Sequence, residues 1–274
     1  MLATRRWVLL IAGFVLVTLA YRVAGAMLLA PDGSLGPTML QAVSPAAAAI
    51  GMLAATAVAG FIAVGVARME SALSGLAVMG AGMCWWATSL SGIRGTLLEG
   101  SAALIAADGM VWTLVVLVLT WLVLTRGQPV PNVHPERVGE SPDPLRSVDA
   151  LRMLACGLVA LPVVWLIAVN DLRGQAVMAA VLGGMAAGIV GRMAAPHVQP
   201  MILPAGVVLA GTAALWVTGT MLPEDVAVAW ARGDVPNLAR LTPIDWAAGA
   251  LLGTPLGFGW GGGFLKHEGE SVAA

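Results

Sequence analysis

Two ionisable residues beside or within apolar stretches are the first candidates for chemistry. Arg22 lies in the apolar stretch that begins at Trp7, and Asp108 stands directly before the one that begins at Gly109. A charge is costly in a hydrocarbon environment, and charged groups found there are commonly paired and functional. We therefore consider an ion pair between Arg22 and Asp108. In the alternative interpretation, Arg22 extends to a polar boundary beside Tyr21.

The other acidic residues do not suggest ion transport. Asp32, Asp171 and Asp245, like Asp108, stand at the ends of apolar stretches and not in their middle. Proton or cation pathways use carboxylates inside the membrane. These positions argue against an ion-coupled carrier.

The histidines and cysteines form no recognisable site. His134, His197 and His267 fall in polar stretches, which leaves no intramembrane histidine to ligate a haem or a chlorophyll. Cys84 and Cys156 lie far apart within apolar runs, as small buried residues do. We therefore predict no catalytic, cofactor-binding or metal-binding residue, and the sequence favours a protein that is not an enzyme.

Two short segments faintly resemble the aspartate motifs of the prepilin peptidases. These are Asn170-Asp171-Leu172-Arg173 and the stretch from Gly257 to Lys266. The second motif of that family is Gly-x-Gly-Asp, whereas Gly262 and Gly263 stand where its catalytic acid is required. One aspartate cannot replace a pair that shares a proton, so we exclude this activity.

The composition indicates a membrane protein. Of the 274 residues, 59% are hydrophobic and 11% are charged, against about 25% charged in soluble domains. The net charge of −1 gives no reason to expect nucleic acid as a partner. We expect the lipid bilayer to surround the chain.

Eight apolar segments approach the roughly 20 residues that a transmembrane helix needs. We therefore predict an all-α, polytopic transmembrane bundle of about eight helices in two four-helix halves. Seven helices with a re-entrant last segment are the alternative. The segments are Trp7–Leu29, Pro45–Ala67, Ser71–Leu90, Gly109–Thr125, Leu151–Val169, Gln175–Gly191, Met201–Met221 and Trp246–Leu265.

A proline-rich stretch divides the chain. We predict a first transmembrane half over 1–126, a cytoplasmic linker over 127–149, and a second half with a short cytoplasmic tail over 150–274. Similar sequences end the second and sixth apolar segments, which leaves a duplication of the two halves open. With the N-terminus inside, nine basic residues face the cytoplasm and five face outward. We expect both termini in the cytoplasm of a bacterium and the bundle in its inner (plasma) membrane.

Glycines recur at the spacing of one helix face. Gly184 and Gly188 form one such ridge, and Gly253, Gly257 and Gly261 form another. Small residues let transmembrane helices approach closely. The ridges therefore predict helix packing within the chain or contact with a partner.

Two functions follow from these patterns. We predict a non-catalytic, multi-pass subunit that packs into a larger membrane protein complex through Gly/Ala-rich helix faces, with other membrane subunits as partners. The alternative is a small-solute transporter or channel built from two related halves. Its cavity would be lined by Arg22, Asp108, Thr88, Ser89 or Thr254.

Overall fold

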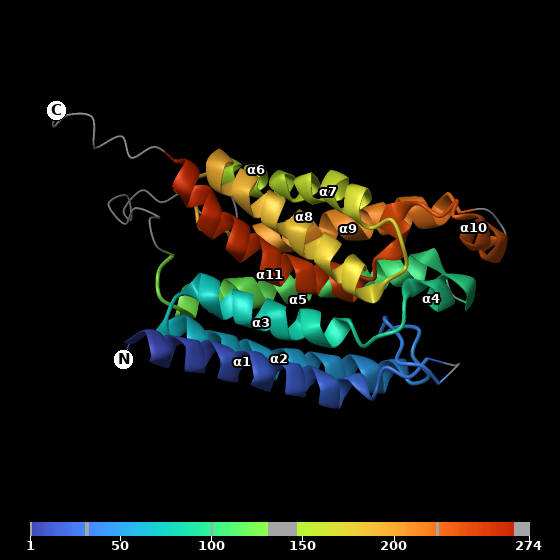
Figure 1. Cartoon of the computed structure of the whole chain (residues 1–274), viewed down its shortest axis with the longest axis horizontal. Coiled ribbons are helices and arrows are strands. Elements are labelled where there is room, and N and C mark those ends of the chain that lie inside the picture. Colours follow the sequence, from blue (N-terminus) through green and yellow to red (C-terminus); the bar gives the residue numbers. More distant parts are fainter. Residues whose placement is uncertain (1, 31–32, 100, 131–146, 223–224, 266–274) are drawn as a thin grey trace.

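The computed structural model describes residues 2–30, 33–99, 101–130, 147–222 and 225–265 (Figure 1). These residues form an all-α structure, with one isolated β-bridge between Leu29 and Leu35. The helices are α1 (Leu2–Gly25), α2 (Pro45–Met69), α3 (Ala72–Ala87), α4 (Ile93–Glu99), α5 (Ala102–Arg126), α6 (Val148–Cys156), η2 (Gly157–Val159), α7 (Ala160–Ile167), α8 (Arg173–Ala194), α9 (Leu203–Thr220), α10 (Val226–Arg232), η3 (Asn237–Arg240), α11 (Pro243–Gly261) and η4 (Gly262–Phe264).

Six helices are long and apolar enough to cross a membrane. Four of them correspond to α2, α5, α8 and α9, one is most of α1, and one is the continuous run of α6, η2 and α7. The predictions of an all-α fold and of a multi-pass membrane protein are therefore confirmed. Of the eight predicted segments, the two that do not qualify are α3, which has 16 residues, and the glycine-rich α11.

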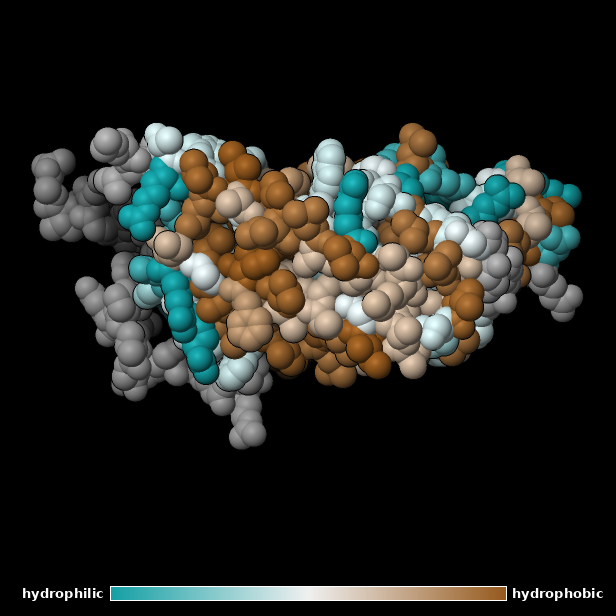
Figure 2. All heavy atoms as spheres, turned by 90° about the horizontal axis from the view of Figure 1, so that it is seen from below, coloured by the Kyte–Doolittle hydropathy of each residue, from teal (hydrophilic) through white to brown (hydrophobic). Residues whose placement is uncertain are grey.

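The long helices run side by side along one axis (Figure 1). The start of α1 and the end of α11 lie at one end of the bundle, here called the terminal end, and α4 and α10 lie at the opposite or distal end. Hydrophobic residues cover most of the face formed by α1 and α2, and hydrophilic residues gather toward its two ends (Figure 2). Apolar side chains of α1 and α2, such as Val23 and Phe61, are exposed, which implies contact of these helices with lipid.

Helix α11 is the core of the bundle. It packs most extensively against α8 and α3 and also contacts α9 and α5. All residues of 241–251 and also Gly253, Thr254 and Pro255 are buried. The last predicted segment is thus a helix with Pro255 inside it, and its glycines let the backbone of α8 approach closely.

The two predicted four-helix halves do not form separate bundles. Helix α3 packs on α11, and α5 packs on α9, so each half contributes to the interior of the other. Residues 131–146 of the predicted linker and the tail beyond residue 265 lie outside the described residues.

Candidate functional site

The predicted glycine ridges meet each other inside the chain. Gly184 and Gly188 of α8 face the backbone of α11, and Gly253 and Gly257 of α11 face carbonyl oxygens of α8. A β-carbon at Gly184 would lie 2.8 Å from the carbonyl oxygen of Gly249, and one at Gly261 would lie 2.7 Å from the β-carbon of Arg192. All five predicted glycines are therefore used to pack α11 within its own chain.

A second glycine face of the same segment is unoccupied. A β-carbon at Gly259 or Gly263 would have no other atom within 4 Å. Trp260 and Phe264 beside them are each 66% exposed. We call Gly259, Trp260, Gly263 and Phe264 the open ridge. The sequence pattern did not separate this face from the buried one, since glycine occurs on both.

The predicted ion pair between Arg22 and Asp108 is not formed. Arg22 lies on the exposed side of α1, whereas the Asp108 side chain is completely buried. Its Oδ1 accepts a hydrogen bond of 3.0 Å from the backbone N–H of Met39. Asp108 therefore fastens the segment after α1 to the first turns of α5. The backbone N–H of Met39 is thus the hydrogen-bond donor to Asp108, where we had considered the guanidinium of Arg22.

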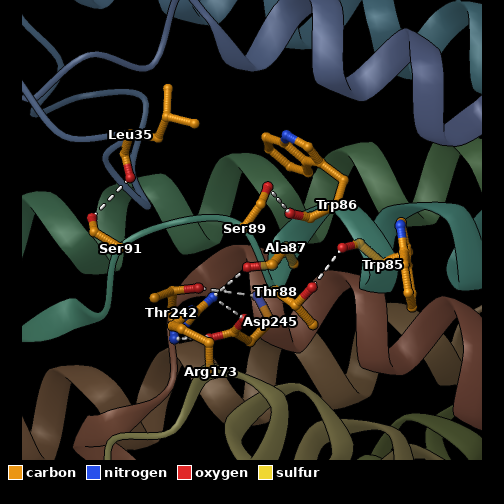
Figure 3. Close-up of polar contacts among 10 residues, drawn as sticks. All are labelled: Leu35, Trp85, Trp86, Ala87, Thr88, Ser89, Ser91, Arg173, Thr242 and Asp245. Atoms are coloured by element: carbon orange, nitrogen blue, oxygen red, sulfur yellow. Dashed lines mark hydrogen bonds and ion pairs between the residues drawn. The ribbon is translucent and has the colours of Figure 1, made fainter.

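A different arginine, Arg173, forms a buried ion pair. Arg173, at the start of α8, donates from Nη1 to Asp245 Oδ2 at 2.8 Å and from Nη2 to Asp245 Oδ1 at 2.6 Å. Its Nη2 also donates to the carbonyl oxygen of Ala87 at 3.1 Å (Figure 3). Asp245 is fully buried and forms a capping box with Thr242 at the start of α11. This Arg173 bridge ties the distal ends of α3, α8 and α11 together.

A second charged cluster holds the distal helices. Asp171 accepts hydrogen bonds from Nη1 of Arg240, at 2.7 Å, and from the indole N–H of Trp230. The Arg240 guanidinium also lies over the Trp230 ring, 5.8 Å from its centre. Asp171, which belongs to the excluded peptidase motif, thus fastens α10 and η3 to the loop before α8.

The distal end also contains a cavity of about 480 Å³, here called the distal pocket. Ala30 and residues from the 34–41 and 91–96 segments line it, together with Leu104 and Asp171. The backbone N–H and the hydroxyl of Ser91 both donate to the carbonyl oxygen of Leu35, at 2.9 and 2.8 Å (Figure 3). The hydrogen bond from the backbone N–H of Met39 to Asp108 attaches the same loop to α5. Two separate anchors therefore fix the pocket wall.

The residues predicted for a transport cavity serve other purposes. Thr88, Ser89 and Thr254 donate their hydroxyls to backbone carbonyls of their own helices, at 2.7, 2.6 and 2.7 Å. Neither these three residues nor Arg22 and Asp108 line the distal pocket.

The described residues hold no group of three or more His, Cys, Asp or Glu side chains that could bind a metal ion. His197 is exposed in the loop before α9, while Asp32, His134 and His267 lie outside the described residues. The side chains with accessible polar chemistry at the pocket are thus Arg94 and Asp171, beside small hydroxyl and amide groups. Comparison of the chain with protein-family models, with curated proteins and with solved structures finds no match.

Proposed function

We propose that this chain is a non-catalytic subunit of a larger membrane assembly, and that the open ridge receives a transmembrane helix of a neighbouring subunit. The five predicted glycines, for which packing within the chain or contact with a partner was expected, pack α11 against α8 within the chain. We therefore place the partner surface on the other face of the same segment. This proposal keeps the predicted role and changes the residues that carry it.

The open ridge is the observation that carries the proposal. Lipid tails are as apolar as leucine, so helices associate in a bilayer through close packing at small residues. Gly259 near the end of α11 and Gly263 in the 3-10 turn η4 both leave space beside the backbone. Trp260 and Phe264, each directly after one of these glycines, supply large exposed apolar surfaces. A partner helix would gain close backbone approach at the glycines and contact area at the rings.

We further propose eight crossings with both termini in the cytoplasm. Helices α3 and α11 run along the same axis as the six long spans. Their 16 and 19 residues give roughly 24 and 28 Å at 1.5 Å per residue, close to the roughly 30 Å of a hydrocarbon core. An even number of crossings agrees with the start of α1 and the end of α11 lying at one end. The basic excess of the terminal segments favours the cytoplasmic side of a bacterial plasma membrane.

The test is the mass of the particle extracted from its own membranes in mild detergent. We expect the protein mass of the particle, without detergent, to exceed the 27.9 kDa of one chain. Gly259→Leu should reduce this protein mass to that of the single chain. Gly65→Leu is the matched control, because Gly65 is equally open but lies on α2. A monodisperse wild-type monomer with no accompanying chain, or equal behaviour of the two variants, would contradict the proposal.

A small-solute transporter is the second candidate. Its support is the exchange of helices between the halves, α3 with α11 and α5 with α9, and the short distal helix that precedes the last helix of each half. Related repeats commonly place a transport site at their interface. A Thr254→Cys variant tests this, since Thr254 is buried in α11. Labelling by a membrane-impermeant maleimide supports an aqueous path, and full protection of the thiol contradicts it.

A further inference from the structure

The distal pocket has the volume of a small-molecule site, and hydrogen bonds anchor one of its walls. Its volume of about 480 Å³ falls within the roughly 300–1,000 Å³ of small-molecule pockets. Its lining comes from segments far apart in the sequence, and the hydrogen bonds of Ser91 and Asp108 hold the loop that forms one wall. Binding costs less when the walls are ordered before the ligand arrives. This feature is independent of the proposed subunit contact, which lies at the other end of α11.

Arg94 gives the pocket a preference for a negative group. Its side chain is exposed and makes no ion pair or hydrogen bond to another residue that the structure describes. Asp171 also lines the pocket, but its charge is balanced by Arg240. Among the described side chains that line the pocket, Arg94 therefore carries an uncompensated positive charge. The planar guanidinium matches a carboxylate in two parallel hydrogen bonds.

Asp171 adds a second requirement on the ligand. Its two oxygens already accept one hydrogen bond each, from Arg240 and Trp230. A carboxylate offers about four acceptor positions, and this side chain is 46% exposed. It can therefore accept a further hydrogen bond from a ligand amine.

We propose that the distal pocket binds a small zwitterion of the amino acid or dipeptide class. The carboxylate of the ligand would lie on Arg94 and its ammonium group on Asp171. Pro37, Leu40 and Leu104 supply apolar lining for a side chain between them. No bond is made or broken, so the site recognises and releases the solute unchanged.

Equilibrium dialysis of the full chain in detergent against L-alanyl-L-leucine tests this proposal. The dipeptide should bind saturably at millimolar concentration or below. Its C-terminal amide lacks the carboxylate and its N-acetyl derivative lacks the ammonium. Each should bind about 10- to 100-fold more weakly, the value for losing one charge-assisted interaction. Absence of saturable dipeptide binding, or equal affinity for the dipeptide and the amide, would overturn the proposal.

The Arg94→Gln variant distinguishes dipeptide binding at the distal pocket from non-specific binding elsewhere on the protein. It should lose the same 10- to 100-fold in affinity for the dipeptide and should no longer distinguish the dipeptide from its amide. Arg22→Gln is the matched control, because Arg22 is another exposed arginine that does not line the pocket. The melting temperatures of both variants establish that each is folded. Wild-type binding by Arg94→Gln would refute the assignment, whatever the result for the open ridge.

Discussion

Replacement of Gly257 by alanine should damage the core of this protein. The added β-carbon would be placed deep inside van der Waals contact with the carbonyl oxygen of Met185, and its three nearest neighbours are all backbone atoms of that residue. A helix backbone cannot rotate away as a side chain does. Helices α8 and α11 must therefore move apart to admit the methyl group.

The loss of unfolding free energy follows from the van der Waals contacts that weaken when α8 and α11 move apart. Gly253 lies against the Val181 carbonyl and Gly249 against Ala180 on the same interface, so these contacts open together. A gap of about 0.5–1 Å forfeits a quarter to a half of each contact of about 0.1–0.2 kcal/mol. Over a few tens of atom pairs, this agrees with the roughly 1–3 kcal/mol measured for overpacked cores. We expect the free energy of unfolding to fall by about 2 kcal/mol.

Reversible unfolding in mixed micelles measures this free energy, and Gly65→Ala provides the control. Gly65 lies inside α2, with nothing within 4 Å of an added β-carbon. Its replacement should be neutral or slightly stabilising, because alanine has the higher helix propensity. If Gly257→Ala proves as stable as Gly65→Ala, the close approach of α8 and α11 does not stabilise the bundle.

The remaining predictions concern the polar anchors. Asp245→Ala leaves the Arg173 guanidinium without its carboxylate and should cost about 3 kcal/mol of unfolding free energy. A double-mutant cycle with Arg173→Met should show coupling, and additive effects would contradict the bridge. Thr242→Ala removes the cap of α11 and should lower the melting temperature in line with a loss of about 1 kcal/mol. Asp108→Ala should speed hydrogen exchange at the Met39 amide, while Asp108→Asn, which keeps the acceptor oxygen, should leave it slow.

The long helices could be predicted because apolar length is a local property of the sequence. The segment predicted over Pro45–Ala67, for example, is α2 at Pro45–Met69. The short helices α4 and α10, of seven residues each, were not predicted. Two turns are too few for a periodic pattern to stand out. The glycine run after Pro255 has poor intrinsic helix propensity, yet α11 continues to Gly261 because α8 offers a face that only glycine can approach.

The polar contacts were harder to predict because they join distant parts of the chain. Arg173 and Asp245 are 72 positions apart, and no spacing rule connects them. The capping box of Thr242 and Asp245 at the start of α11 was found only in the structure. The expectation for Asp108 was wrong for a related reason. It rested on charge alone, whereas a buried backbone N–H also needs an acceptor and Met39 supplied one.

The central position of α11 has a consequence for how the protein is made. Helices α3, α5, α8 and α9 all leave the ribosome before the helix on which they pack. At about 5–20 residues per second, translation from Ala87 to Pro243 takes roughly 8–30 s. During that time the small-residue faces of α3 and α8 have only lipid, or an insertion chaperone, to cover them. Biogenesis should thus be the stage at which this protein is most vulnerable to degradation.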